Sequence, residues 1–254
     1  MTDLIVFSVG NNRYALKIEN IQRIIQSVEL TDIPNAHDLI DGMMSYEGKV
    51  IKVLNFRKLI ALETYEDELQ QMFVKLKVAH QNWVDELKNS IYNGTPFTKT
   101  TNPRKCELGV WLDSFKSVDE MITATLNELV NNHKQLHMLG AEALEVYNSD
   151  VEKAKKIVDQ EVELKFHQTM SAIDTFIIKL STVANSLQKL ILYEKDEKYF
   201  AIKVDAIEDI AHIEESTVMR AEEEHGISEL LELEGILDMD GVLINVIKNI
   251  DIPN

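Results

Sequence analysis

The chain alternates apolar and polar residues with a period of two near both of its ends, and with a period of three to four in between. Residues 4–25 and 190–211 each consist of an apolar strand, a polar turn and a second strand, the pattern of a β-hairpin. Residues 42–56 and 235–249 repeat this pattern around a turn that contains an acidic residue and a glycine. Because successive side chains of a strand point to opposite faces, the pattern predicts β-structure at both ends.

The two ends of the chain also resemble each other in sequence. The first pair of segments aligns without a gap at an offset of 186 residues, and the second pair aligns at an offset of 193. Any two hairpins look alike, but two matches in the same order indicate an internal duplication. We therefore predict a β-domain made of two similar units, residues 1–65 and 190–254.

The intervening residues 66–189 are poor in Gly and Pro and have the apolar spacing of amphipathic helices. Helix starts are indicated by capping signals: Thr64 with Asp67, Ser117 with Glu120, Ser149 with Glu152, and Asn102 before Pro103. These signals predict helices at about residues 65–93, 103–115, 118–147 and 150–189. Short connections favour antiparallel packing. The predicted fold class is α+β, with a β-domain interrupted by a four-helix-type bundle that has one short member.

Three histidines and the single cysteine are the candidate metal ligands. His80 takes a core position in the apolar stripe of its helix, and His133 and His137 lie one turn apart on a buried face. A buried imidazole without a partner costs free energy, and one shared metal ion would remove that cost. Cys106, near the start of the short helix, completes a set of four nitrogen and sulfur ligands suited to tetrahedral zinc. The helix N-terminus is also expected to favour its thiolate.

Taken singly, these residues have ordinary explanations. A lone core histidine is more often hydrogen-bonded packing than a ligand, and a lone cysteine usually acts as a small hydrophobe. Their joint occurrence favours a metal. The remaining histidines are excluded: His167 falls on the flank of its helix beside Glu163, and we expect His37, His212 and His225 at the surface.

Composition and charge narrow the functional classes. The formal net charge of -17, from 43 acidic and 26 basic residues, argues against nucleic acid or an anionic membrane as the partner. No apolar run approaches the roughly 20 residues of a membrane span, and the N-terminus lacks the features of a signal peptide, so we expect a cytoplasmic protein. With one cysteine, no intramolecular disulfide can form. The HExxH, phosphate-loop and nucleophile motifs are absent, which favours a non-enzyme.

The central region resembles the chemoreceptor zinc-binding (CZB) domain. The family pattern is a histidine followed by tryptophan, then C-x-L-G-x-W, then H-x-x-x-H. Here the matching residues are His80 with Trp83, the stretch CELGVW from Cys106 to Trp111, and His133 with His137. The resemblance implies that His80, Cys106, His133 and His137 bind one Zn²⁺ ion.

The flanking regions resemble CheW, the coupling protein of bacterial chemotaxis. The resemblance rests on the stretches FSVGNNRYALKIENIQRII, GMMSYEGKVIKVLNF and YFAIKVDAIEDI. It implies two small five-stranded β-barrels and a scaffold that links chemoreceptor signalling tips to the histidine kinase CheA, in the cytoplasm or at membrane-associated receptor arrays. The sequence departs from the family at Glu47, where an arginine that bears on array contacts is usual.

The resulting hypothesis is a chemotaxis adaptor that senses zinc or oxidants. Oxidation of a metal-bound Cys106 thiolate would remove a ligand. One alternative is a metal-dependent hydrolase in which three of the residues bind zinc and water holds the fourth position. Another is an adaptor whose zinc is purely structural. The sequence leaves a homo-oligomer open.

Overall fold

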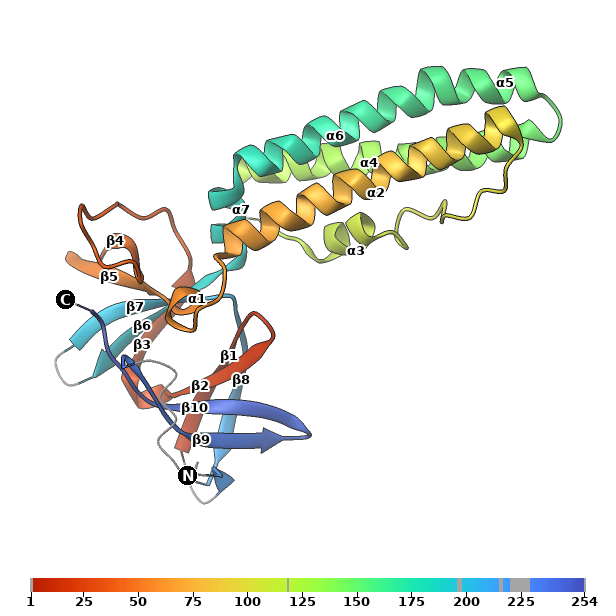
Figure 1. Ribbon diagram of the computed structural model, residues 1–254. Coiled ribbons are helices and arrows are strands. Elements are labelled where there is room, and N and C mark those ends of the chain that lie inside the picture. The colour runs from red at the N-terminus through yellow and green to blue at the C-terminus, as the bar shows by residue number, and fades with distance from the viewer. Residues whose placement is uncertain (1, 118, 196–197, 215–216, 220–228, 254) are drawn as a thin grey trace. The chain divides into compact units, whose positions relative to one another are not determined.

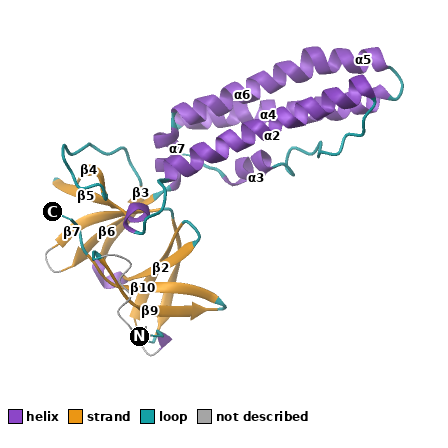
Figure 2. Ribbon diagram, viewed as in Figure 1, coloured by secondary structure: helices purple, strands orange, loops and turns teal. Residues whose placement is uncertain are grey.

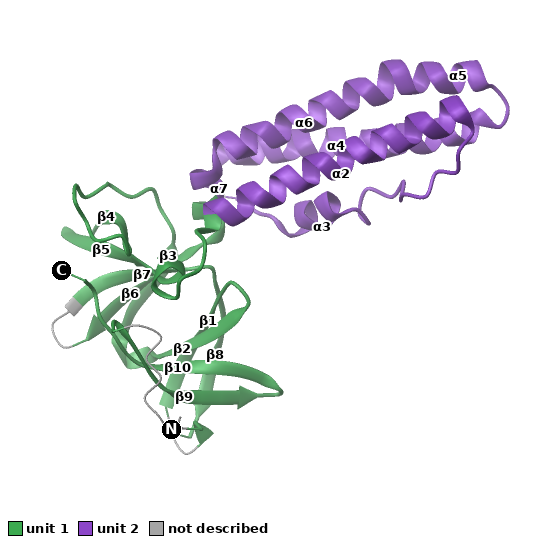
Figure 3. Ribbon diagram, viewed as in Figure 1, with its two compact units in different colours: residues 1–65, 184–254 green, residues 66–183 purple. Residues whose placement is uncertain are grey.

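The structure is a computed structural model, and it describes residues 2–117, 119–195, 198–214, 217–219 and 229–253 (Figure 1). The chain forms two compact units, one of residues 1–65 with 184–254 and one of residues 66–183 (Figure 3). The strands belong to the first, which we call the β-unit, and the long helices form the second, the helical unit (Figure 2). No helix among the described residues is long and apolar enough to cross a membrane.

The β-unit contains two five-stranded sheets, ordered β8-β1-β2-β10-β9 and β3-β6-β7-β5-β4. The strands are β1 (Thr2–Val9), β2 (Asn12–Lys17), β3 (Ile21–Gln26), β4 (Ile40–Tyr46), β5 (Lys49–Asn55), β6 (Lys189–Lys195), β7 (Lys198–Val204), β8 (Ala206–Ile213), β9 (Leu231–Met239) and β10 (Val242–Ile250). A 3₁₀ turn, η1 (Ile18–Asn20), follows β2, and the short helix α1 (Phe56–Leu59) follows β5.

Each sheet combines strands from both ends of the chain. The hairpin β1–β2 belongs to the same sheet as β8, β9 and β10, and the hairpin β6–β7 belongs to the sheet of β3, β4 and β5. The predicted hairpins are present, and the two sheets do not coincide with the two ends of the chain, residues 1–65 and 190–254. Periodicity specifies which face of a strand is buried, and it does not specify which hairpin pairs with which.

The internal duplication is preserved in the strand register. Phe7 pairs with Tyr14 in the first hairpin, and the equivalent pair in the second hairpin is Tyr193 with Phe200. The parallel contact between β10 and β2 pairs Val246 with Ala15, and its counterpart between β5 and β7 pairs Val53 with Ala201. The two alignments read from the sequence therefore describe equivalent positions in three dimensions.

The apolar core of the β-unit has three parts. One cluster includes Phe7 and Tyr14 of one sheet, Tyr193 and Phe200 of the other, and Phe56 of α1. Each sheet also has a smaller cluster of its own, around Val6 and Ile244 in one sheet and around Val53 and Leu192 in the other. The strands are thus stabilised by apolar burial on both faces.

The helical unit is a bundle of three long helical segments and one short helix. Its elements are α2 (Tyr65–Asn93), α3 (Glu107–Ser114), α4 (Glu120–Tyr147), α5 (Val151–Lys156), the π-helical turn η2 (Ile157–Val162), α6 (Glu163–Ile178) and α7 (Leu180–Leu187), which continues into the β-unit. Side chains from α2, α4 and the α5-to-α6 segment share one apolar cluster, which includes Trp83, Leu136 and Val158. This arrangement agrees with the predicted four-helix-type bundle.

Three helix starts differ from the prediction. The short helix begins at Glu107 with Cys106 as its N-cap, and not at Pro103. The cap of α4 is Asp119, which accepts a hydrogen bond from the Ile122 amide at 2.8 Å, and Asp150 caps α5. Asp119 comes two residues after Ser117 and Asp150 comes directly after Ser149, and a capping signal does not decide between acceptors so close in the sequence.

Candidate metal centre

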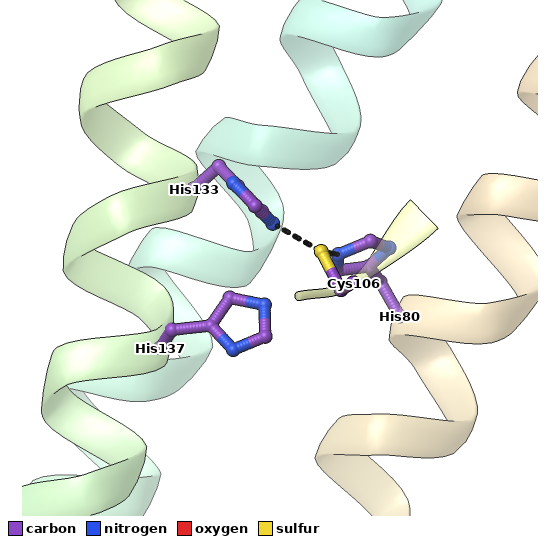
Figure 4. Close-up of side chains that lie close together, drawn as sticks. All are labelled: His80, Cys106, His133 and His137. Atoms are coloured by element: carbon purple, nitrogen blue, oxygen red, sulfur yellow. Dashed lines mark hydrogen bonds between the residues drawn. The ribbon is translucent and has the colours of Figure 1, made fainter. Parts of the chain in front are cut away.

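The structure brings the four candidate ligands together. His80 comes from α2, His133 and His137 come from successive turns of α4, and Cys106 caps α3 (Figure 4). One ligand atom from each residue can be chosen such that all four lie within 4.8 Å of one another. Three histidines and a cysteine from three different helices thus converge on one point.

The separations of the ligand atoms are close to those in a zinc site. Cys106 Sγ lies 3.1 Å from His133 Nε2 and 3.9 Å from His80 Nε2. Tetrahedral zinc, with bonds of about 2.0–2.3 Å, holds neighbouring ligand atoms roughly 3.3–3.8 Å apart. Side-chain movements on the order of 1 Å would therefore complete the geometry. His80 Nδ1 contacts the Leu76 carbonyl at 2.8 Å, and this donor role leaves Nε2 unprotonated toward the cysteine.

His137 gives the strongest indication that a ligand belongs here. Its side chain is fully buried, and neither ring nitrogen has a hydrogen-bonding partner among the described residues. Leaving a buried polar group unpaired costs about 1–3 kcal/mol. A metal bound by one nitrogen of His137 would offset this cost. The four side chains therefore fit a zinc ion in two respects: they are nitrogen and sulfur donors, and one of them lacks a hydrogen-bonding partner among the described residues.

The electrostatics favour neutral imidazoles. Burial, together with His137 and His80, lowers the pKa of His133 to about 3. Burial and His80 lower the pKa of His137 to about 4, against an opposing effect of the Thr100 backbone, and burial also lowers the pKa of His80. Neutral imidazoles have a free lone pair, which is the form that binds metal.

The helix N-terminus was expected to favour the Cys106 thiolate, but the pKa of this thiol lies above its ordinary value. Burial raises the pKa of the thiol, although the Gly109 amide donates a hydrogen bond to Sγ at 3.3 Å and opposes the effect. The thiol in turn donates to the Pro103 carbonyl at 3.4 Å. A metal ion would supply the positive charge that the peptide dipoles alone do not, because coordination deprotonates a thiol.

Two glycines and a tryptophan set the shape of the site. A Cβ atom on Gly109 would lie 1.7 Å from the Pro103 carbonyl oxygen, so only glycine lets the Cys106 loop approach α3. A Cβ atom on Gly140 would lie 2.2 Å from the Trp83 ring. That ring lies 4.8 Å from the His137 ring, and its Nε1 donates to the Thr100 carbonyl. Gly140 was not predicted as a site residue, although a glycine within a long helix is a signal of close packing.

Glu86 was also missed by the sequence reasoning. Its carboxylate accepts hydrogen bonds from both the amide and the hydroxyl of Thr98, at 2.7 and 2.8 Å. It thereby fastens the segment that leads to Cys106 onto α2. The contact reaches from α2 across the end of the helix to a segment without secondary structure, residues 94–98, and periodicity carries no signal for it.

The excluded histidines lie where the sequence placed them, as far as they are described. His167 is exposed and lies 3.5 Å from the Glu163 carboxylate. His37 and His212 are exposed. His225 lies outside the described residues. Trp111 packs against Phe73 and Phe115 and has no described ring contact with the candidate ligands.

Two known family models match the chain. The CheW-like domain model matches residues 3–86, and the chemoreceptor zinc-binding domain model matches residues 80–144, a range that includes all four candidate ligands. The chain carries a CheW-like domain and a CZB domain. Both halves of the predicted recognition, and the mixed α and β fold class, are thereby confirmed.

Curated CheW proteins match parts of the chain. The chemotaxis protein CheW of Thermotoga maritima is 21% identical over 72 residues, which cover 28% of this chain and 48% of that protein. CheW of Bacillus subtilis is 24% identical over 130 residues, which cover 50% of this chain and 80% of that protein. The chain thus spans about half the length of the first relative.

Two solved structures are similar. The scaffolding protein TtCheW of Thermoanaerobacter tengcongensis has a TM-score of 0.46 at 14% identity, covering 97% of this chain and 88% of that one. The regulatory CZB domain of DgcZ has a TM-score of 0.38 at 17% identity, covering 46% of this chain and 99% of that one.

Proposed function

We propose that the protein is a non-enzymatic chemotaxis scaffold whose CZB domain binds Zn²⁺ through His80, Cys106, His133 and His137 and responds to zinc or oxidants. The observation that carries this proposal is the fully buried His137, unpartnered among the described residues and beside three other donor side chains. Because the donors come from three helices, zinc would hold α2, α3 and α4 together. Zinc binding to small structural sites contributes roughly 10 kcal/mol or more.

An oxidant response would act through Cys106. Attack of the thiolate on a peroxide breaks the O–O bond and yields a sulfenic acid and hydroxide, and the sulfur then binds the metal poorly. Cys106 is partly exposed, in contrast to the three buried histidines, so it is the ligand that a dissolved oxidant reaches first.

A buried ion pair lies in the β-unit close in sequence to the point where the chain leaves it. Arg57 in α1 is almost fully buried, and its Nε and Nη2 donate to the Asp205 carboxylate at 2.8 and 2.7 Å. Arg57 Nη1 also donates to the Glu63 carbonyl, and the guanidinium lies 4.6 Å from the ring of Tyr65, the first residue of α2. The start of the insertion is thus fastened to the strand end that holds Asp205.

The other end of the insertion reaches the same carboxylate. Gln188, which follows α7, donates to Asp205 at 3.2 Å. The Gly10 amide, in the turn between β1 and β2, donates to Asp205 at 2.7 Å. One carboxylate therefore joins Arg57, Gln188 and the β1–β2 turn, and all four residues belong to the β-unit.

The proposed partners are the kinase CheA and chemoreceptor tips. The substitution at Glu47 bears on these contacts. Glu47 lies in the turn between β4 and β5, with φ of 49°, and its carboxylate is 3.6 Å from the guanidinium of Arg23 on β3. Both side chains are exposed. In place of the arginine that is usual at this position, the turn carries Glu47 paired with Arg23. The variant Glu47→Arg is therefore expected to alter kinase or receptor binding.

The experiment that tests the proposal measures CheA and receptor binding with and without a chelator. Native protein is expected to change its affinity on zinc removal, and Cys106→Ala is expected to behave as zinc-free protein in both conditions. His167→Ala, which removes an exposed histidine outside the cluster, is the matched control. If the affinity of the native protein is unaffected by chelator while zinc is demonstrably lost, the zinc is structural and the sensing proposal fails.

A further inference from the structure

A pocket of about 470 Å³ adjoins the candidate metal centre. It lies between the loop at residues 102–104, α3 and α4, and its lining includes Pro103, Gly109, Val130 and His133. Pro103, Gly109 and His133 are three of the four residues with a polar contact to Sγ, so the sulfur lies directly behind this wall.

The charged side chains of the pocket are mainly cationic. Arg104 and Lys134 line it, together with Asp113. Arg104 and Asp113 are both mostly exposed and 3.9 Å apart, so this pair neutralises the guanidinium weakly. Lys134 has no ion pair or hydrogen bond to any part of the chain that the structure describes. In a chain with a net charge of -17, this local excess of positive charge favours anions at one place.

We propose that the pocket binds small monoanions, with Arg104 and Lys134 as their charge partners, and that it gives anionic reagents preferred access to Cys106. This inference rests on the proposed function, because it assigns a ligand class to the surroundings of the same site. The pocket volume of about 470 Å³ is ample for small carboxylates and oxyanions, so the selection is by charge and not by size. An anion bound there would lie beside His133 and close to the sulfur.

The test compares two alkylating reagents of nearly equal size, iodoacetate and iodoacetamide, on the full chain. In both reactions the Cys106 thiolate forms a C–S bond and iodide leaves, so the reagents differ mainly in charge. Because Cys106 is the single cysteine, the mass of the peptide that contains it, measured after proteolysis, reports its modification separately from that of other side chains. The quantity measured is the ratio of the iodoacetate rate to the iodoacetamide rate.

In Arg104→Gln/Lys134→Gln this ratio is expected to fall by about three- to ten-fold, with little change in the iodoacetamide rate. The single variant Arg104→Gln, in an exposed loop, is expected to show part of the effect. Added salt should lower the ratio for the native chain more than for the double variant. Lys75→Gln/Lys156→Gln removes two exposed lysines outside the pocket and serves as the matched control.

Equal ratios in the pocket and control variants would overturn the inference. Zinc content, measured separately by mass spectrometry, distinguishes this failure from failure of the proposed function. Variants that bind zinc normally without a change in the ratio contradict only the anion pocket. A chain that binds no zinc contradicts the proposed function, and its alkylation ratio still reports on the pocket.

Discussion

The buried polar groups of the β-unit and of the helical unit differ in how they are satisfied. In the β-unit, Lys203 is almost fully buried and lies 3.4 Å from Asp41. Burial opposes ionisation of Asp41, but Lys203, together with hydrogen bonds from Lys58 and Asn55, outweighs burial and lowers its pKa. In the helical unit, the buried imidazole of His137 has no described partner. Among the described buried side chains of the β-unit only Gln188 Oε1 also lacks a hydrogen-bonding partner, whereas both ring nitrogens of His137 lack one in the helical unit, beside three other metal donors.

This difference predicts that zinc removal acts on one unit only. A chelator is expected to lower the free energy of unfolding of the helical unit by several kcal/mol, up to about 10, and to leave the β-unit nearly unchanged. Both tryptophans, Trp83 and Trp111, lie in the helical unit, so their fluorescence reports its unfolding. In calorimetry, the midpoint temperature of one unfolding transition should fall when zinc is removed, and the midpoint of the other should stay unchanged. Parallel movement of both transitions would contradict the distinction.

The converse experiment perturbs the β-unit. Asp205→Asn removes the charge that pairs with the buried Arg57, and is expected to destabilise the β-unit by about 3–5 kcal/mol because an uncompensated charge remains. Zinc affinity should be retained. Glu208→Gln, which removes one partner of the exposed pair with Arg13, is the control and should cost less than about 1 kcal/mol. The thermal midpoint of the zinc-insensitive transition is the measurement.

His137→Leu should change stability in opposite directions with and without zinc. In zinc-free protein the leucine removes an unpaired buried imidazole, and the helical unit is expected to gain about 1–3 kcal/mol. In the presence of zinc the variant lacks a ligand and should be less stable than the native protein. Chemical denaturation in the two conditions checks this reversal. Destabilisation in both conditions would show that His137 contributes by packing.

The zinc-free helical unit is expected to lose stability as the pH falls. The folded-state pKa values of about 3 for His133 and about 4 for His137 lie below the ordinary value of 6.5. Below pH 6.5 the unfolded chain takes up protons that the folded chain does not, so stability falls as pH drops from about 6.5 towards 4. Each histidine contributes a slope of up to about 1.4 kcal/mol per pH unit. His133→Asn should reduce the slope.

Local features of the fold were predictable because the chain encodes them over short distances. The hairpins follow from alternation, and the convergence of His80, His133 and His137 follows from helical spacing. Exchange of hairpins between the sheets was not predictable, since both pairings bury the same faces. The Arg57–Asp205 pair joins residues 148 positions apart, and neither residue stands out from its neighbours in the sequence.

The central claim is that three histidines and one cysteine bind a single zinc ion. Zinc X-ray absorption on the purified full chain tests it most directly. The predicted spectrum fits one sulfur at about 2.3 Å and three nitrogens at about 2.0–2.1 Å, and loses its sulfur contribution in Cys106→Ala. An oxygen in place of one protein ligand would contradict the closed site and support the hydrolase alternative, and absence of sulfur from the native spectrum would exclude Cys106 as a ligand.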